Sequence, residues 1–128
     1  MTTLLDLADA KYVLLTTFRR TGEPVQTPVW AVRDGDGLAV TTLDGTGKVK
    51  RLRHTPRATV QVCDMRGRVA PDAPVVPALA TIDAGPTAWS STAPALVAKY
   101  GLTARFTALG DRLRRGKGER VVLRLRPA

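Results

Sequence analysis

The sequence predicts one mainly β domain over residues 1–128, a small closed or partly open barrel of about six antiparallel strands with few, short helices. Three observations predict this class. Short segments with strand-like alternation of apolar and polar residues recur along the chain. Tight-turn residues separate them, above all the Asp-Gly-Asp-Gly run at 34–37, which favours a hairpin. Only short stretches carry helical spacing.

The first part of the chain predicts a short helix followed by three strands, at residues 3–9, 12–19, 24–33 and 38–43. The first strand is a β-branched and aliphatic run that ends at the turn 20–23. In the second strand, alternate residues face opposite sides of the sheet, with Val25, Thr27, Val29 and Ala31 on one side and Gln26, Pro28, Trp30 and Val32 on the other. A tryptophan on such a strand is either a core or interface residue or a ligand contact, and the sequence leaves both interpretations of Trp30 open.

The second part predicts three helices and three strands. A basic helix over KVKRLRHT (48–55) closes at Pro56, and strands follow at 57–64 and 75–83. A helix over 92–100 has Thr92 as its cap, Pro94 in its first turn and Gly101 at its end. A further helix around 103–114 and a last strand over 119–126 complete the chain, with Val121, Leu123 and Leu125 facing inward.

Composition and charge narrow the functional classes. The hydrophobic fraction of 44% is that of a folded domain, and no apolar run approaches the length of a membrane span. The single cysteine, Cys63, excludes a disulfide framework and a multi-cysteine zinc module. The start MTTLLDLADA has no features of a secretion signal, so we expect a cytoplasmic protein. The formal net charge of +9 calls for an anionic partner.

The positive charge gathers in two clusters. The first comprises Lys48, Lys50, Arg51, Arg53 and Arg57, and the second comprises Arg112, Arg114, Arg115, Lys117 and Arg120. Either cluster can be a solvated surface. The residues around the first cluster give it the stronger case for a ligand.

Side chains for acid–base, nucleophilic or metal chemistry are scarce. His54 is the single histidine and lies at the end of a basic helix, where a surface position is expected. Cys63 lies in a strand and fits a small core residue. No two acids have the spacing of paired catalytic carboxylates, so we predict neither catalytic side chains nor a metal site.

The run Gly45-Thr46-Gly47-Lys48 predicts a phosphate site at a helix start. It is not a nucleotide-binding P-loop, because Thr42 and Val49 stand where that motif needs glycine and a hydroxyl residue. The open helix N-terminus, the Thr46 hydroxyl and the cations of Lys48, Lys50 and Arg51 nevertheless suit an anion. Thr41 and Thr42 add two hydroxyls at the end of the preceding strand. The alternative is a solvated basic helix.

Three segments carry a resemblance to a known family: YVLLTTFRRTGEPVQTPVW (12–30), DGDGLAVTT (34–42) and GTGKVKRLRHTPRATVQVCDMRGR (45–68). Their order and motifs resemble the actinobacterial F420-dependent oxidoreductases of the pyridoxamine-5′-phosphate-oxidase-like superfamily, whose fold is the flavin-reductase-like split β-barrel. The resemblance covers about half of the chain, and the last strand is similar more loosely. It implies a six-stranded antiparallel split barrel that binds its cofactor between the two subunits of a homodimer.

The resemblance also implies a ligand for each candidate residue. Coenzyme F420 is a deazaflavin with a phosphate and an oligoglutamate tail. Its ring would lie along Pro28 and Val29, its phosphate would be held by Thr41, Thr42, Thr46 and Lys48, and its tail would run past Lys50 and Arg51. FMN is the alternative cofactor, because flavin-using members place it in the same groove. An enzyme of this kind transfers a hydride to an unsaturated small molecule and needs no acid–base pair.

Other functions remain open at this point. A protein that binds F420 without turnover is one alternative, and an FMN-dependent oxidoreductase is another. A nucleic-acid-binding barrel is disfavoured, because 5% aromatic residues and the lack of paired stacking aromatics do not suit it. The segment 70–90, rich in proline and alanine, departs from the family and leaves the substrate open.

Overall fold

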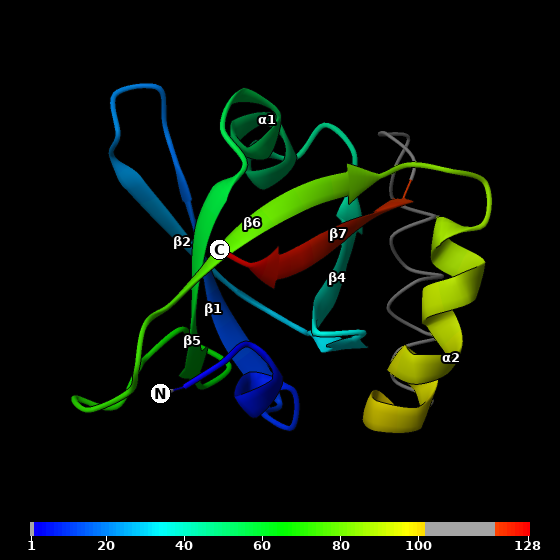
Figure 1. Cartoon of the computed structure of the whole chain (residues 1–128), viewed down its shortest axis with the longest axis horizontal. Coiled ribbons are helices and arrows are strands. Elements are labelled where there is room, and N and C mark those ends of the chain that lie inside the picture. Colours follow the sequence, from blue (N-terminus) through cyan, green and yellow to red (C-terminus); the bar gives the residue numbers. More distant parts are fainter. Residues whose placement is uncertain (1, 102–119) are drawn as a thin grey trace.

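Seven antiparallel strands form one sheet in the computed structural model of the chain, which describes residues 2–101 and 120–128. The sheet order is β2-β1-β5-β6-β7-β4-β3, so β2 and β3 are its edges (Figure 1). The strands are β1 (Tyr12–Phe18), β2 (Pro24–Val29), β3 (Val32–Asp34), β4 (Gly37–Leu43), β5 (Arg57–Cys63), β6 (Val76–Asp83) and β7 (Arg120–Pro127). The described helices are the 3-10 helix η1 (Leu5–Leu7), α1 (Gly47–His54) and α2 (Ala88–Tyr100).

The predicted strands are confirmed in order and type, but their number is seven rather than six. The expected strand 24–33 is interrupted after Val29 and resumes as β3 at Val32. The interruption has a cause in hydrogen bonding: the Ala31 amide donates to Tyr100 Oη at 3.1 Å, and the Ala31 carbonyl accepts from Lys99 Nζ at 2.5 Å. Side chains of α2 therefore hold the Ala31 peptide, which a pattern within residues 24–33 cannot reveal.

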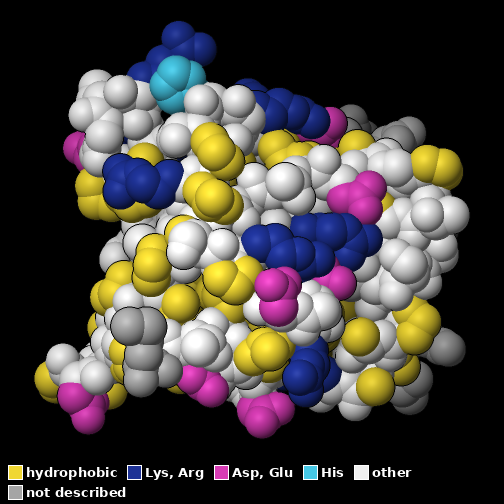
Figure 2. Space-filling model, viewed as in Figure 1, with side chains coloured by type: hydrophobic (Ala, Val, Ile, Leu, Met, Phe, Trp, Pro, Cys, Tyr) yellow, Lys and Arg dark blue, Asp and Glu magenta, His cyan; other side chains and the backbone are white. Residues whose placement is uncertain are grey.

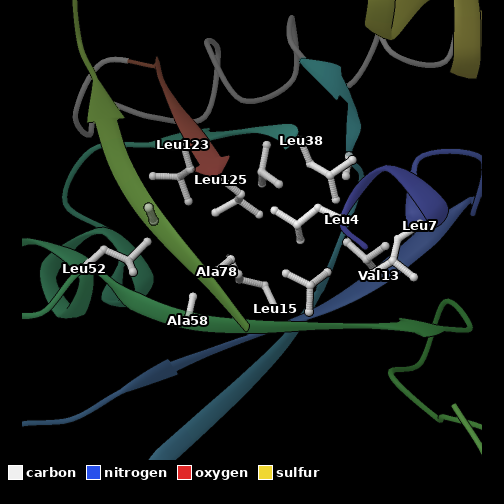
Figure 3. Packing of buried hydrophobic residues seen from close by; sticks show 14 of the residues in the cluster. Leu4, Leu7, Val13, Leu15, Leu38, Leu52, Ala58, Ala78, Leu123 and Leu125 are labelled. Atoms are coloured by element: carbon white, nitrogen blue, oxygen red, sulfur yellow. The ribbon is translucent and has the colours of Figure 1, made fainter. Parts of the chain in front are cut away.

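The core lies on both faces of the sheet. The larger cluster fills the barrel interior between η1 and α1, and includes Leu4, Leu15, Leu38, Leu123 and Leu125 (Figure 3). A smaller cluster on the opposite face joins Val32, Ala39 and Val122 to α2, with Trp30, Trp89 and Tyr100 packed against it. Val121, Leu123 and Leu125 face the interior as predicted. Val122 is also fully buried because α2 covers its face.

The helices differ from expectation at their starts. The expected helix 3–9 is only the 3-10 turn η1. Helix α2 begins at Ala88 rather than at residue 92, so Thr92 is not its cap. Thr92 is buried inside the helix, and its hydroxyl donates to the Ala88 carbonyl at 2.9 Å. The predicted end at Gly101 is confirmed by its positive φ of 72°.

The helix expected over 103–114 and the basic residues from Arg112 to Lys117 lie outside the described residues. No helix within the described ranges combines the length and the apolar character that crossing a membrane requires.

A group of ion pairs joins β7 to the end of β3 and to the end of β6. Arg124 bridges Asp34 at 3.0 Å and Asp83 at 2.9 Å, and Arg126 Nη2 reaches Asp34 at 2.9 Å. In the space-filling view, basic side chains bordered by acidic ones lie where the ribbon view places β7 (Figure 2). Part of the positive charge is thus neutralised within the fold.

Candidate functional site

The predicted phosphate site lies at the start of α1, immediately after β4. Thr46 is the N-cap residue, with extended backbone angles, but its side chain makes no capping hydrogen bond. Its Oγ1 is buried and has no hydrogen-bond partner among the described residues. Buried hydroxyls in native proteins nearly always have a partner. This hydroxyl lies beside the first amides of a helix N-terminus, the kind of place that favours an anion.

Arg51 turns back over the first turn of the same helix. Its Nε donates to Thr17 Oγ1 of β1 at 2.7 Å, which fixes the direction of the side chain. Its Nη1 lies 2.8 Å from the point where a Cβ on Gly47 would stand. Gly47 therefore leaves the space that the guanidinium occupies, and a cation lies against the helix start.

Lys48 supplies a second cation. Its side chain is half-buried, and burial followed by the charge of Arg51 lowers the pKa of its ammonium from the usual value. A bound anion would offset both effects because it would replace lost solvation and screen the two cations from each other. We call Thr46, Lys48, Arg51 and the first amides of α1 the anion site.

The two strand-end threonines do not converge on this site. Thr41 pairs with Val122 and Thr42 pairs with Val121, and these valines belong to the core clusters of opposite faces. Thr42 is buried on the interior face, which α1 also covers through Val49 and Leu52. Thr41 lies on the face that α2 covers. Of the two, only Thr42 shares a face with α1.

Pro28 and Val29 lie at the other end of the β1–β2 pair. Val29 pairs with Val13, whereas Val25 pairs with Thr17, the residue that holds Arg51. Four residues of strand separate these positions, which is about 13 Å. Val29 packs against the interior core, and Pro28 lies on the opposite face near Gly67. Only an elongated ligand can contact both the anion site and these residues.

The other cations of the first basic cluster have different surroundings. Lys50 is exposed. Arg53 forms a bidentate ion pair with Asp44, in which Nη1 donates to Oδ1 at 2.7 Å and Nη2 donates to Oδ2 at 3.2 Å. The Arg57 guanidinium lies 3.7 Å from the centre of the Phe18 ring. The cluster is therefore not one uniform basic surface.

His54 is exposed, as expected. Cys63 is not the core residue that the sequence predicted, because it is partly exposed in β5 and belongs to neither core cluster. Burial, and then the charge of Asp64, raise the pKa of the Cys63 thiol, which makes it a poorer nucleophile. Of the second basic cluster, Arg120 is described, and its guanidinium lies 4.6 Å from the centre of a Trp89 ring. Within residues 2–101 and 120–128, no three His, Cys, Asp or Glu side chains gather as a metal site.

A second group of residues, around Trp30 and Tyr100, was not predicted from the sequence to form a site. The rings of Trp30 and Tyr100 stack at a centroid distance of 4.3 Å and an interplanar angle of 5°. They line a pocket of about 460 Å³ at the start of β1. The sequence pattern singled out Trp30, but its stacking partner Tyr100 lies in α2, and no local pattern links the two residues.

Solved structures share this fold at low sequence identity. An F420 reductase aligns with a TM-score of 0.66 and 20% identity over 100% of this chain and 95% of its own. The heme storage protein HutZ from Vibrio cholerae aligns with a TM-score of 0.68 and 16% identity, over 92% and 82%. A FAD-binding protein from Mesorhizobium loti aligns with a TM-score of 0.64 and 17% identity, over 94% and 82%.

No curated protein sequence matches the chain. The family profile described as pyridoxamine 5′-phosphate oxidase matches residues 4–128, which is nearly the whole chain. This match confirms the resemblance drawn from the sequence and, with the seven-stranded sheet, the mainly β split-barrel class. The chain belongs to the pyridoxamine 5′-phosphate oxidase family.

Proposed function

We propose that this protein is a cytoplasmic F420-dependent reductase that passes a hydride from the reduced deazaflavin to an unsaturated small molecule. The observation that carries the proposal is the buried Thr46 hydroxyl, which has no hydrogen-bond partner among the described residues and stands at the start of the helix that carries Lys48 and Arg51. The split-barrel family and its structural likeness to an F420 reductase support the choice of cofactor class.

The residues present fit the phosphate of such a coenzyme. A phosphate offers acceptor oxygens to the Thr46 hydroxyl, the amides of the first helical turn, the Lys48 ammonium and the Arg51 guanidinium. The missing Cβ at Gly47 leaves room for Arg51 to take part. Thr46 stands at the N-cap position, but its side chain bonds no backbone amide, which is consistent with a ligand binding there.

The distance between the anion site and Pro28–Val29 favours an elongated coenzyme. Because about 13 Å of strand separates them, a free phosphate or a small phosphorylated metabolite reaches only one. A flavin-like ring joined to a phosphate by a sugar chain spans both. Lys50, exposed on the same helix, is left for the glutamate tail, which F420 has and FMN lacks.

The chemistry fits the scarcity of acid–base groups. The deazaflavin, when bound, supplies a two-electron hydride donor. The protein's residues then need only to fix the anionic tail, to orient the ring along β2 and to exclude water from its reacting face. Edge strand β2 suits this role because one row of its backbone groups faces away from β1.

We also propose that two copies of the chain form the working unit. Leu79 on β6 and Val75, four residues before it, are large aliphatic side chains that are 47% and 57% exposed. A second copy covering β5 and β6 would bury them. Sedimentation velocity tests this: we expect a dimer for the native chain and a shift towards monomer for Leu79→Arg.

Two measurements test the proposed function. Fluorescence titration with F420, run in parallel with FMN, should give micromolar or tighter binding of F420 and weaker binding of FMN. Anaerobic mixing of reduced F420 with enones, quinones and tetrapyrroles should then show acceptor-dependent reoxidation.

Three other outcomes of these measurements would change the assignment as an F420-dependent reductase. Tight F420 binding without reoxidation by any acceptor would indicate a carrier. Preferential FMN binding would indicate a flavin enzyme of the same fold. Binding of neither cofactor would overturn the proposal.

A further inference from the structure

A pocket lies at the opposite end of β1 from the anion site. It has a volume of about 460 Å³, within the range of small-molecule sites, and is lined by Asp9, Lys11, Tyr12, Trp30, Lys99 and Tyr100. These residues come from the segment before β1, the end of β2 and the last turn of α2. In the ribbon view, that turn lies at the η1 end of the molecule and α1 lies at the other end (Figure 1).

The charges of the pocket favour a single anionic group. Two lysines and one aspartate leave one net positive charge among the lining residues. Lys99 Nζ donates to the carbonyls of Ala8 and Ala31 at 2.7 and 2.5 Å. An ammonium carries three donor hydrogens, and two of them serve these carbonyls, while Nζ also lies 5.1 Å from the centre of the Tyr100 ring. An anion in the pocket would compete with that ring for the third hydrogen. Burial lowers the pKa of Lys99, although Asp9 opposes the shift, and a bound anion would favour its charged form.

The aromatic residues favour a planar group beside that anion. Trp30 and Tyr100 form a parallel stacked pair, and the Tyr12 ring lies 6.0 Å from Lys11 Nζ. The pair is held in place because Tyr100 Oη is hydrogen-bonded to the Ala31 amide at 3.1 Å and to the Lys11 carbonyl at 2.8 Å. A rigid aromatic wall with one cation at its edge suits a flat ring that carries a carboxylate.

We propose that this pocket binds a small aromatic carboxylate, with the ring against the Trp30–Tyr100 wall and the carboxylate at Lys99 and Lys11. The pocket starts one residue beyond Val29, beside the strand that takes the coenzyme ring in the proposed function. Its role as the substrate pocket therefore rests on that proposed function, whereas binding of the carboxylate itself does not.

The test uses the full chain without any coenzyme and follows tryptophan fluorescence and binding heat. The probes are 2-naphthoate, the neutral 2-naphthylmethanol and the cationic 2-naphthylmethylamine. We expect the carboxylate to bind at least tenfold more tightly than the alcohol, and the amine to bind most weakly. Equal affinity for the three probes, or tightest binding of the amine, would overturn the inference.

Charge-removing variants locate the binding. Lys99→Gln keeps amide donors for the two carbonyls, and we expect it to bring naphthoate affinity down to that of the alcohol. Lys11→Gln changes an exposed residue and should lower naphthoate affinity threefold to fivefold. This variant therefore tests the inference even where Lys99→Gln does not fold. Arg33→Gln removes one exposed charge from β3 and should change nothing. Naphthoate binding that is unaffected by Lys11→Gln and by a folded Lys99→Gln would contradict the inference.

The result separates this inference from the proposed function. Carboxylate binding in a protein that binds no F420 would keep the pocket and remove the reductase assignment. F420 binding and turnover in a protein that does not bind naphthoate would support the reductase assignment and overturn the carboxylate pocket.

Discussion

Arg51 and Thr17 join helix α1 to strand β1 through a hydrogen bond of 2.7 Å from the guanidinium Nε to the buried hydroxyl. Thr17 is 1% exposed, so this acceptor is fixed by the core. The bond leaves the terminal nitrogens of Arg51 directed towards the start of α1, where Gly47 makes room. One buried threonine thus sets the position of a cation to which the proposed function assigns the coenzyme phosphate.

Thr17→Val should weaken F420 binding without unfolding the protein. The change keeps the shape of the side chain and removes the acceptor of Arg51 Nε, so the guanidinium loses its fixed direction. We expect a threefold to tenfold loss of affinity and about 1 kcal/mol lower unfolding free energy. Thr16→Val is the matched control because Thr16 is also buried but faces the other side of β1. Equal effects of both variants on affinity would contradict this role for Thr17.

Gly47→Ala should also lower affinity, through space rather than through a hydrogen bond. The new Cβ would stand 2.8 Å from Arg51 Nη1, and this flexible side-chain end can move away. Stability should be unchanged or slightly higher, because alanine favours the first helical turn more than glycine does. Titration with F420 and a urea unfolding curve measure the two effects. Unchanged affinity would show that Arg51 does not contact the ligand.

Gly37→Ala should instead destabilise the fold strongly. A Cβ at Gly37 would stand 1.8 Å from the backbone oxygen of Leu125, which cannot move without breaking the β4–β7 pairing. We expect a loss of at least about 2 kcal/mol in unfolding free energy, measured by urea denaturation. Gly47→Ala is the control, since its clash is with a side chain. A loss below about 0.5 kcal/mol would show that β4 and β7 are less tightly joined than the structure indicates.

Asp34→Asn should change the pH dependence of stability. Burial raises the pKa of Asp34, but hydrogen bonds and charges from Arg124 and Arg126 outweigh it and hold the pKa below its usual value. The unfolded pKa is about 3.9, so the ionised carboxylate stabilises the fold above that pH. This stability is lost as the pH falls through the lower, folded pKa.

Urea denaturation at several pH values measures this effect. At pH 7 the variant should be about 1–2 kcal/mol less stable than the native chain, and the gap should narrow below about pH 4. Asp36→Asn is the control because that carboxylate is 71% exposed and lies 3.7 Å from Arg126. A gap that stays constant from pH 7 to pH 3 would contradict the role assigned to Asp34.

Local patterns predicted the strands because each strand carries its own signal. Alternation and the Asp-Gly turn placed β4 and β7 within a residue or two, and the glycine-flanked threonine placed the start of α1. The start of α2 was misplaced because Thr92 has a cap-forming side chain but bonds Ala88 within the helix. The split between β2 and β3 was missed because Lys99 and Tyr100 cause it from the far part of the chain.

The site shows the same division. Thr46, Lys48 and Arg51 are close in sequence, and the structure places them together at one helix start. Thr41 and Thr42 are also adjacent, but strand alternation sends them to opposite faces. Thr17 of β1 contacts Arg51 of α1, and the Trp30–Tyr100 pair likewise joins residues that are distant in sequence. Such contacts depend on topology, which one sequence does not display.

The most direct test of the anion site compares F420 with its phosphate-free deazaflavin riboside core, in the native chain and in Lys48→Ala. If Lys48 binds the phosphate as proposed, the substitution should weaken F420 binding by about 10- to 150-fold, equivalent to about 1.5–3 kcal/mol. Affinity for the core should stay within about twofold, since the proposed place of the ring is along β2, away from α1. If Lys48→Ala binds F420 as tightly as the native chain does, or loses affinity equally for both ligands, the start of α1 does not hold the coenzyme phosphate.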